Sequence, residues 1–573
     1  MSSLSAALTN IMESAFEALE LPREYARVQV SVAGQDSQFQ CNGALACAKV
    51  AKKNPRDIAE SIIVHLKSGR DEGIFHTLSV GGPGFININL NDTVVAEFMK
   101  RIEKDAACGI VKAENAQTVV LDYGGPNIAK AMHVGHLRSS IIGDSLRRVY
   151  GFGGYETIGD VHMGDWGTPM GMILSELDNI GHYGGLTMEM LAEIYPKASN
   201  ACKEDEARMA QAREATRKLQ DGDEAYTRTW REFIEVSIAG MKKNFDALGV
   251  HFDEWKGESD AHRYIADMIK DAKAKNMARE SDGALIVDVA REGDKKEIPP
   301  LLLLKSDGAV LYGTTDLATI IDRVKTHAPE KIIYIVDQRQ HLHFEQVFRA
   351  ADMLDVMPED KLVFAGFGTM NGTDGKPFKT RAGGVMRLED LIQMATDKAA
   401  ARLDEAELAQ DMDAAERTEI AQKVGLAALK FADLQNNRIS DYVFDLDRMT
   451  AFEGKTGPYL LYQAVRIQSL LNKAGDFDAS GDLIIGDGER GLALKLCELD
   501  HAFQGTLVNN APHILCEHLY ALAQEFSSFY GNCKVLPEKD EDVRRTRLVL
   551  CQQTHKQLSL MLSLLGISIP ERM

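Results

Sequence analysis

Two histidines stand three positions apart in the segment His133-Val134-Gly135-His136. A β-branched run at residues 118–121 predicts a strand before them, and a helix is expected to begin at about Met132. We therefore expect both histidines in the first turn of this helix, where unpaired backbone N–H groups and the helix dipole favour phosphate. Imidazole N–H groups there would donate to phosphate oxygens that gain charge during group transfer. Gly135 would let a flat ring such as adenine approach the backbone.

Three other interpretations of this pair stay open on the residues alone. Two histidines at this spacing can bind zinc, although no further His/Cys pattern lies nearby. They can also form a hydrogen-bonded structural pair, or belong to another class of phosphate-binding protein. The tetrapeptide alone therefore predicts nucleotide binding with no more weight than these alternatives.

A second candidate phosphate site is a cationic, glycine-rich loop. Glycines at 372, 375, 383 and 384 flank Lys376, Lys379, Thr380 and Arg381. Three cations within six residues suit a polyphosphate. A solvated basic turn is the alternative, and on the pattern alone it is favoured.

The elements expected around these residues indicate a multidomain α/β protein. Strands are predicted at 118–121, 284–289, 332–336 and 362–364, with helices between them, which favours a doubly wound, Rossmann-type parallel sheet. Residues 186–250 are predicted to be a helical insertion in this domain, and connecting helices follow residue 390. Residues 1–112 mix helices with strands at 27–32 and 85–90, which predicts a small α+β domain, and residues 454–573 predict an all-helical domain.

Composition and charge indicate the cellular compartment of the protein and the partners that it can bind. No run of 18 apolar residues is present, the first residues lack a signal-peptide pattern, and the eight cysteines form no CxxC pair. We therefore expect a cytoplasmic protein with reduced, buried thiols and no membrane partner. The net charge is −20, but residues 113–454 carry 41 Lys and Arg against 58 Asp and Glu. Both ends are thus near neutral, which permits an RNA ligand without predicting one.

Taken together, the sequence around the histidines resembles one enzyme family. Asp122 to Lys130 followed by His133 to Arg138 resembles the class I aminoacyl-tRNA synthetases, and within them the arginyl-tRNA synthetases. The family's usual Ser-Pro-Asn is replaced by Gly125-Pro126-Asn127. The resemblance covers essentially the whole chain, and the motifs occur in the family's order.

The resemblance implies an ATP-dependent activation of L-arginine, with Mg²⁺, and transfer to the 3′ end of tRNA(Arg). His133, Gly135 and His136, with Lys376, Lys379 and Thr380, then correspond to the ATP site. The loop sequence Lys379-Thr380-Arg381 departs from the standard pattern of the class, and in this family Lys130 is thought to supply the missing charge. Lys130, His133, His136, Lys379 and Arg381 are the implied catalytic residues. No bound metal ligand is predicted in the protein itself.

An arginine pocket requires carboxylates for the guanidinium, because its planar fork pairs with them in a bidentate manner. By resemblance the pocket consists of Asn127, His136, Glu258, Tyr312, Asp316 and Gln340. Tyr312 and Asp316 also stand four apart and are expected on one helix face. Without the family context, a solvated surface charge is the better explanation of each carboxylate.

Both ends of the chain resemble the family's RNA-reading domains. Phe85 and Asn87 match a base-reading pair in the N-terminal domain that touches the tRNA elbow, although tyrosine is common where Phe85 stands. Tyr459, Arg544, Arg547 and the terminal Met573 match the helical anticodon-binding domain. An exposed helix face explains the arginines equally well.

Two alternative functions remain at the level of sequence. The chain can be a class I synthetase for another amino acid, or a catalytically silent RNA-binding paralogue. The intact His133, His136 and Lys379 argue against the second alternative. We expect a monomer.

Overall fold

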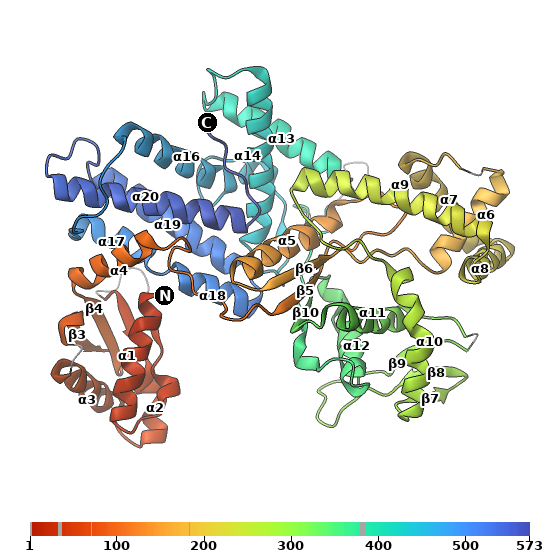
Figure 1. Cartoon of the computed structure of the whole chain (residues 1–573), viewed down its shortest axis with the longest axis horizontal. Helices are drawn as coiled ribbons and strands as arrows, with labels where there is room; N and C mark the ends of the chain where they lie inside the picture. The colour runs from red at the N-terminus through yellow and green to blue at the C-terminus, as the bar shows by residue number, and fades with distance from the viewer. Residues whose placement is uncertain are drawn as a thin grey trace. The chain divides into compact units, whose positions relative to one another are not determined.

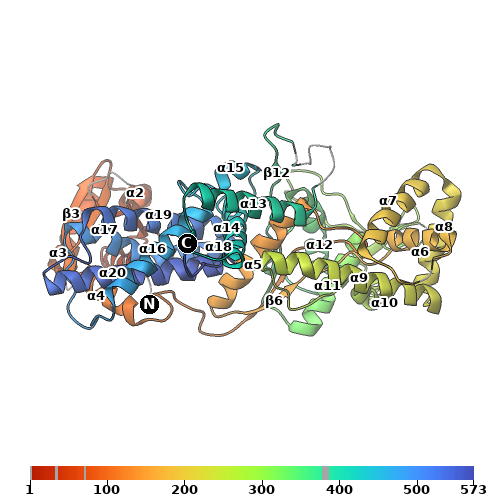
Figure 2. The ribbon, with the colours of Figure 1, turned by 90° about the horizontal axis from the view of Figure 1, so that it is seen from above.

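The chain folds into two compact units, each built from separated stretches of sequence. The computed structural model describes residues 3–31, 37–69, 72–182, 184–306, 308–376, 378 and 386–573 (Figures 1 and 2). One unit contains residues 1–112, 459–563 and 569–573, and the other contains residues 113–458 and 564–568. Among the described residues, no helix combines the length and apolar character that a membrane span requires.

The larger unit, residues 113–458 and 564–568, is centred on a four-stranded parallel sheet. Its strand order is β11-β10-β5-β6, with β5 at Thr118–Asp122, β6 at Glu156–Asp160, β10 at Lys331–Tyr334 and β11 at Leu362–Phe364. Val120 pairs with Ile158 on one side and Ile332 on the other. The chain leaves β5 toward β6 and later returns on its other side as β10, which creates a topological switch point. The predicted doubly wound sheet is confirmed.

The first helix of this unit begins later than predicted. A 3₁₀ turn, η3, spans Val134–His136, and α5 spans Leu137–Phe152. His133 is extended, with φ −130° and ψ 170°, so its predicted place in the first helical turn is wrong. The backbone explains this: Val134 N–H donates to Met386 O at 3.1 Å, and Leu388 N–H donates to Met132 O at 3.1 Å. This antiparallel pairing keeps the segment extended up to His133.

The strand predicted at 284–289 exists but belongs to another sheet. β8, Ala284–Val287, lies between β7, Ala278–Ser281, and β9, Leu301–Leu304, and both pairings are antiparallel. Asp282 and Gly283 connect β7 to β8 with φ values of 48° and 79°. Positive φ at both turn positions produces a tight hairpin, which excludes β8 from the parallel sheet.

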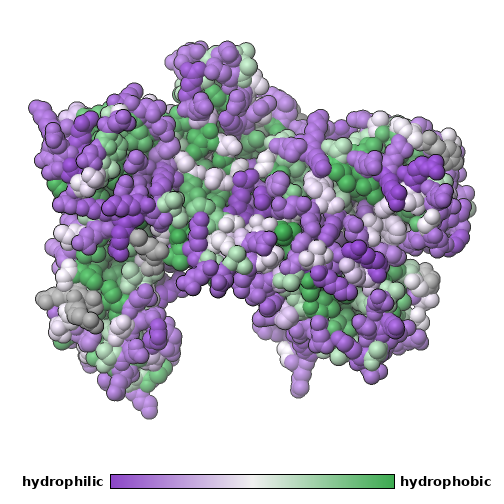
Figure 3. Space-filling model, viewed as in Figure 1, coloured by the Kyte–Doolittle hydropathy of each residue, from purple (hydrophilic) through white to green (hydrophobic). Residues whose placement is uncertain are grey.

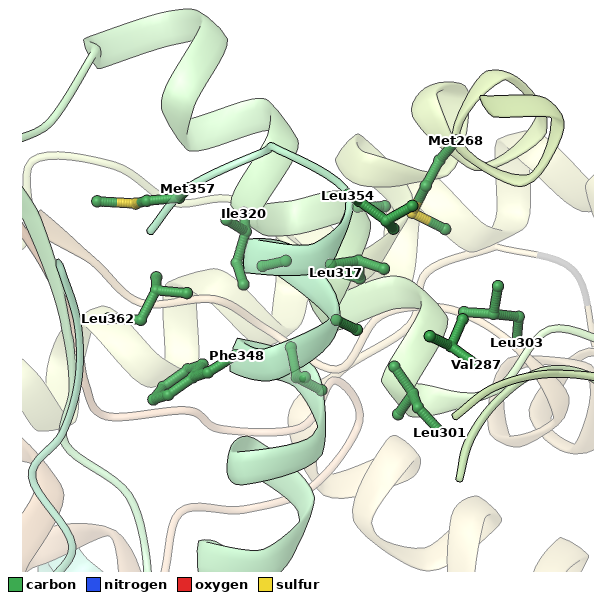
Figure 4. Packing of buried hydrophobic residues seen from close by; sticks show 14 of the residues in the cluster. Met268, Val287, Leu301, Leu303, Leu317, Ile320, Phe348, Leu354, Met357 and Leu362 are labelled. Atoms are coloured by element: carbon green, nitrogen blue, oxygen red, sulfur yellow. The ribbon is translucent and has the colours of Figure 1, made fainter. Parts of the chain in front are cut away.

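A hydrophobic core joins this hairpin sheet to three helices and to the parallel sheet (Figure 4). The helices are α10, Glu258–Ala274, α11, Tyr312–His327, and α12, His341–Met353. Met268, Val287, Leu317, Phe348 and Leu362 belong to the cluster, and each is at most 6 % exposed. The first turns of α10 and α11 are thereby fixed relative to the sheet.

The rest of the larger unit is mainly helical. The stretch predicted as a helical insertion contains α7, Met188–Glu204, α8, Glu206–Gln220, and α9, Glu224–Leu248, and α6, Thr168–Ile180, precedes them. Beyond the parallel sheet come α13, Leu388–Glu405, α14, Ala414–Leu434, and α15, Leu446–Met449. A short parallel pair, β12 at Met370–Asn371 and β13 at Tyr442–Val443, brings the region after α14 against the start of the glycine-rich loop.

The smaller unit combines an α+β domain with a helical bundle. Its antiparallel sheet has the order β1-β2-β4-β3, with strands Val28–Val30, Phe39–Cys41, Phe85–Leu90 and Phe75–Gly81 in that order. Helices α1, Leu4–Ala18, α2, Gly43–Ala51, α3, Pro55–Ser68, and α4, Asp92–Lys104, belong to the same domain. The bundle contains α16, Gly457–Ala474, α17, Asp487–Leu496, α18, Leu499–Asn509, α19, Pro512–Asn532, and α20, Glu541–Leu564. The predicted fold class is confirmed throughout.

The distribution of side chains agrees with a water-exposed protein. The eight cysteines are buried and form no disulfide, as expected for thiols that serve as small apolar residues. Hydrophilic residues cover most of the face seen in Figure 3, with smaller hydrophobic areas among them.

Candidate active site

The two histidines contact each other and are locked by backbone N–H groups. His133 N–H donates to Nδ1 of His136 at 3.1 Å, and Gly135 N–H donates to Nδ1 of His133 at 3.1 Å. The ring centroids lie 4.1 Å apart. Because each Nδ1 accepts a hydrogen bond, each neutral ring carries its proton on Nε2. Both rings are therefore preset as Nε2–H donors.

Burial keeps these rings neutral. It lowers the pKa of His136 to about 3, with smaller contributions from His133 and Lys130. Burial, followed by the charge of Lys130, also lowers the pKa of His133. Neutral donors stabilise charge that develops on a phosphate without changing protonation state during the step.

Arg138, which belongs to the motif, has a structural position. Its Nε donates to Asp433 Oδ2 at 3.0 Å and its Nη1 donates to Ser440 O at 3.1 Å, and the side chain is 2 % exposed. Its guanidinium also lies 5.1 Å from the ring of Tyr442 in β13. Arg138 thus connects α5 with α14 and with the strand pair at the base of the glycine-rich loop.

The segment after β5 holds Asn127 and Lys130 at the surface. Ile128 N–H donates to Gly164 O at 3.1 Å, which fixes the loop beside the segment after β6. Ala129 has φ 61°, and its N–H donates to Ser237 Oγ at 3.0 Å in α9. This left-handed residue turns the chain so that the side chains of Asn127 and Lys130 are both exposed.

Tyr195 of α7 is a site residue that the sequence did not reveal. The ammonium of Lys130 lies 4.6 Å from the centre of its ring, a cation–π distance. Tyr195 is also close enough to Tyr312 to help raise the pKa of that phenol, after burial and Glu258. The helical insertion thereby contributes a side chain between Lys130 and the predicted arginine pocket.

The predicted pocket carboxylates do come together. Burial, together with the charges of Asp316 and Asp165, raises the pKa of Glu258 to about 8. Within the described residues, no side-chain hydrogen bond or ion pair holds the Glu258 carboxylate. Asp316 instead accepts a hydrogen bond from His343 Nε2 at 2.5 Å. Glu258 and Asp316 thus form an acidic site in which, among the described residues, no Lys or Arg side chain pairs with either carboxyl group.

Asp165 stands behind this pair and was not predicted. It is 3 % exposed, and its carboxylate accepts from the N–H of Ser259 at 2.9 Å and from its Oγ at 2.5 Å. Burial raises its pKa as well. Gly257 makes the close approach possible, since a Cβ there would lie 2.4 Å from the carboxyl carbon of Asp165.

The remaining predicted pocket residues are placed less closely. Tyr312 begins α11 one turn before Asp316 and is 66 % exposed. Gln340 is exposed at the end of the 3₁₀ turn η4, Gln338–Gln340, three residues before His343. Within the described part of the chain, no hydrogen bond or ion pair ties its side chain to the carboxylates, so its role stays a prediction.

The catalytic part of the cationic loop lies outside the described residues. This applies to Lys379, Thr380 and Arg381. Lys376 is exposed in a turn that Gly372 N–H closes by donating to Lys376 O at 2.7 Å. The loop re-enters the described structure at Met386, paired with the His133 segment.

A buried ion-pair group lies below the site and was also missed. Arg323 is 0 % exposed, and its Nη2 donates to Asp122 Oδ2 at 2.7 Å and to Asp160 Oδ2 at 2.6 Å. These carboxylates end β5 and β6, so Arg323 of α11 ties the arginine-pocket helix to the switch point. Sequence gives no signal for it, since it pairs residues more than 160 positions apart.

In the smaller unit, the two predicted elbow residues share one face of β4. Residues 85, 87 and 89 alternate with buried Ile86 and Ile88. Phe85 and Asn87 are both half-buried, and Asn87 Oδ1 accepts from Gln40 Nε2 at 2.9 Å.

The predicted anticodon residues have mixed positions. Tyr459 OH lies 3.3 Å from Ser527 Oγ, and Met573 is half-buried. Arg544 is half-buried with an unpaired Nε. Arg547 donates to Glu489 and Glu538 at 2.7 Å each and to Lys534 O at 2.8 Å. Those bonds show a structural role for Arg547, and its RNA contact stays a prediction.

Three family models match the chain in the order that the motifs suggested. Residues 2–90 match the arginyl tRNA synthetase N terminal domain. Residues 100–446 match the catalytic domain of class I (R) tRNA synthetases. Residues 460–573 match the DALR anticodon binding domain.

Whole-chain relatives agree with these models. The chain is 48 % identical to arginine–tRNA ligase of Hyphomonas neptunium and 47 % identical to that of Maricaulis maris, each with 100 % of both chains covered. The crystal structure of arginyl-tRNA synthetase from Plasmodium falciparum is similar with a TM-score of 0.85 and 27 % identity over 100 % of both chains. With the neutral histidine pair, the acidic pocket and these matches together, the chain belongs to the arginyl-tRNA synthetase family.

Proposed function

We propose that this chain is an arginine–tRNA ligase that activates L-arginine with ATP and transfers the arginyl group to the 3′ end of tRNA(Arg). The observation that carries the amino-acid choice is the acidic site of Glu258 and Asp316. Two acidic groups held close together favour a permanently positive ligand group, and guanidinium is the one that pairs with carboxylates in a bidentate manner. Family membership supports the same reaction.

In the first step, the arginine carboxylate attacks the α-phosphorus of ATP in line. A bond forms between a carboxylate oxygen and phosphorus, and the bond to the bridging oxygen breaks, so that pyrophosphate leaves. His133 and His136 donate from Nε2 to the phosphate oxygens, and Lys130 adds a positive charge. Asn127 and His136 are assigned to the polar backbone groups of the substrate, and Glu258, Tyr312, Asp316 and Gln340 to the rest of arginine. We assign Lys376, Lys379, Thr380 and Arg381 to the leaving phosphates.

In the second step, a hydroxyl of the terminal ribose of tRNA attacks the carbonyl carbon of arginyl-adenylate. The new ester bond replaces the bond to the phosphate oxygen, and AMP leaves. We assign residues 113–453 to this chemistry, residues 1–112 with Phe85 and Asn87 to the tRNA elbow, and residues 454–573 with Tyr459, Arg544, Arg547 and Met573 to the anticodon.

Mg²⁺ is expected with ATP rather than in a protein site. Among the described residues, no group of three or more His, Cys, Asp or Glu side chains is arranged to hold a metal. Magnesium is commonly held by substrate phosphates with one or two carboxylates. Its participation in the reaction stays a prediction, which chelation of Mg²⁺ during pyrophosphate exchange tests.

Pyrophosphate exchange with a panel of amino acids, in the presence of tRNA(Arg), tests the substrate. We expect exchange with arginine alone, because only its side chain satisfies both carboxylates. Lysine is the matched comparison, since it carries the same charge without the planar fork. Exchange with any other amino acid and not with arginine would disprove the assignment.

A His136→Ala variant tests whether the chain is an enzyme or a silent RNA-binding protein. Loss of one preorganised donor should reduce kcat for activation roughly a hundred- to thousandfold. Equilibrium tRNA binding should stay unchanged, because His136 lies far along the chain from the assigned RNA-reading residues. Charging at the wild-type rate would support the silent paralogue instead.

The cellular setting is part of the same proposal. We propose a cytoplasmic monomer without a membrane partner, supported by eight buried thiols that form no disulfide, which suits a reducing compartment. Analytical ultracentrifugation and cell fractionation test these two points.

A further inference from the structure

A polar cavity of about 1210 Å³ lies within the smaller unit, apart from the residues assigned above. Helices α4, α16 and α20, which are labelled in Figure 1, supply its lining. The lining residues on α20 follow one side of the helix: Gln552, Gln553, His555, Lys556 and Ser559. Gln552 is exposed and His555, Lys556 and Ser559 are half-buried, so this polar side of α20 is open to a polar ligand.

Gln553 is the clearest sign that the cavity is built for a ligand. Its side chain is 2 % exposed and lines the cavity, yet its Oε1 has no hydrogen-bond partner among the described residues. The buried Oγ of Ser559, six residues further along α20, also lacks a partner in the part of the chain that the structure describes. A buried amide that lacks a partner costs free energy, which a ligand that donates to it would recover.

The other lining groups define the chemistry of that ligand. Gln468 Nε2 already donates to Asn472 Oδ1 at 2.9 Å, which leaves the Gln468 carbonyl and the Asn472 amino group for a ligand. Burial lowers the pKa of His555, so its ring is a neutral donor and acceptor. Half-buried Phe477 supplies an aromatic face. Amides and a neutral imidazole beside an aromatic ring are the groups that read nucleobase edges.

Charge excludes phosphate from the same position. Glu103 and Asp476 line the cavity with a single cation, Lys556, whose Nζ already donates to Asp105 O at 2.7 Å. A phosphate would meet two carboxylates, whereas a neutral ring would not. The ligand is therefore a neutral, planar heterocycle.

The walls of the cavity indicate where such a ring comes from. α20 and most of α16 fall within residues 460–573, which match an anticodon-binding model. The assigned Tyr459 and the lining residue Gln468 stand on different sides of α16, since nine residues advance about 180° beyond two full turns. We propose that this cavity binds one unstacked nucleobase of the tRNA, in addition to the bases read by the residues assigned above. The proposal rests on the function proposed for the chain.

Footprinting of tRNA(Arg) on the full-length enzyme tests this proposal. Dimethyl sulfate and a carbodiimide report which base edges the protein covers. We expect Gln553→Leu to re-expose one unpaired base and to raise the Kd for tRNA roughly five- to hundredfold, the range for loss of a base contact. Ser559→Ala should act on the same base, and it provides the readout if Gln553→Leu does not fold by circular dichroism.

Gln557→Leu is the matched control. Gln557 is on α20, is 0 % exposed and also has an unpaired Oε1, but its Nε2 donates to Leu496 O at 2.9 Å and it does not line the cavity. The proposal is overturned if Gln553→Leu and wild type give the same footprint and Kd, or if Gln557→Leu re-exposes the same base. Arginine charging by wild type is measured in parallel, because its absence would instead refute the proposed function.

Discussion

Glu258 links the binding of a cation at this site to the loss of the proton on its carboxyl group. Its pKa of about 8 in the free protein means that the carboxyl group holds a proton at neutral pH. A guanidinium beside it would favour the charged form and expel that proton. Burial raises this pKa most, and the charges of Asp316 and Asp165 contribute in the same direction.

Arginine binding should therefore strengthen as pH rises from 6 to 8. Below a pKa of about 8 the ligand must displace the proton, so KM for arginine should fall by up to about tenfold per pH unit and then level off. Calorimetry in buffers with different ionisation enthalpies should detect close to one released proton. Glu258→Gln should bind more weakly and lose both effects. An unchanged pH slope in that variant would assign the proton to another group.

At the scale of elements, helix α7 of the insertion reaches Lys130, the proposed catalytic lysine, through Tyr195. The Tyr195 ring contacts Lys130 and lies near Tyr312. Helix α7 therefore adjoins one residue that we assign to ATP activation and one that we assign to arginine binding. Cation–π contacts of this kind hold an ammonium group in place without neutralising it. Tyr195 is thus a positioning residue for Lys130.

Replacement of Tyr195 should affect turnover more than arginine affinity. We expect Tyr195→Leu to lower kcat roughly two- to tenfold, in line with loss of an exposed cation–π contact. Tyr195→Phe keeps the ring and should retain nearly wild-type kcat. Steady-state kinetics with varied ATP and varied arginine separate the effects. Equal losses in both variants would show that the hydroxyl group, rather than the ring, matters.

The sequence predicted elements and residue types better than it predicted their surroundings. Strands β5, β10 and β11 and helix α11 were found because apolar and β-branched runs are local signals. The late start of α5 and the placement of β8 in a hairpin sheet were missed, because they depend on backbone pairing with distant residues 386–388 and 301–304. The protonation of His136 and Glu258 was equally hidden, since burial decides it.

Motif membership also did not separate contact residues from supporting ones. Arg138 belongs to the histidine motif and Arg547 is predicted to bind tRNA, yet both are tied to protein carboxylates. Tyr195 and Asp165 lie in no recognised pattern, yet they adjoin Lys130 and Glu258. Only the three-dimensional structure distinguishes these cases.

On the scale of the whole molecule, a short stretch near the C-terminus completes the catalytic unit. Residues 564–568 belong to that unit, although the residues on either side of them belong to the other. Lys430 Nζ donates to Gly566 O at 2.5 Å, and burial lowers the pKa of this lysine to about 8. Gly566 has φ 67°, and a Cβ there would lie 3.0 Å from Lys430 Nζ and 3.2 Å from Asp144 Oδ2.

Gly566→Ala should therefore destabilise the catalytic unit. A left-handed alanine costs about 1–2 kcal/mol, and disturbing the buried Lys430 contact adds about 1–3 kcal/mol. Gly454→Ala is the control, because Gly454 also has positive φ, 76°, but no atom lies within 4 Å of the added Cβ. Urea unfolding compares the two variants. Equal losses would show that the Lys430 contact contributes nothing.

The hydrogen bond between Lys430 and Gly566 can form only late in the synthesis of the protein. The ribosome makes Asp144 and Lys430 well before Gly566, so the nascent catalytic unit contains a buried lysine without its carbonyl acceptor. Because α5, which follows the histidine pair, carries Asp144, this helix acquires its final surroundings only after the helical bundle has been translated. A chain interrupted within α20 would therefore present every catalytic motif and still lack a finished active unit.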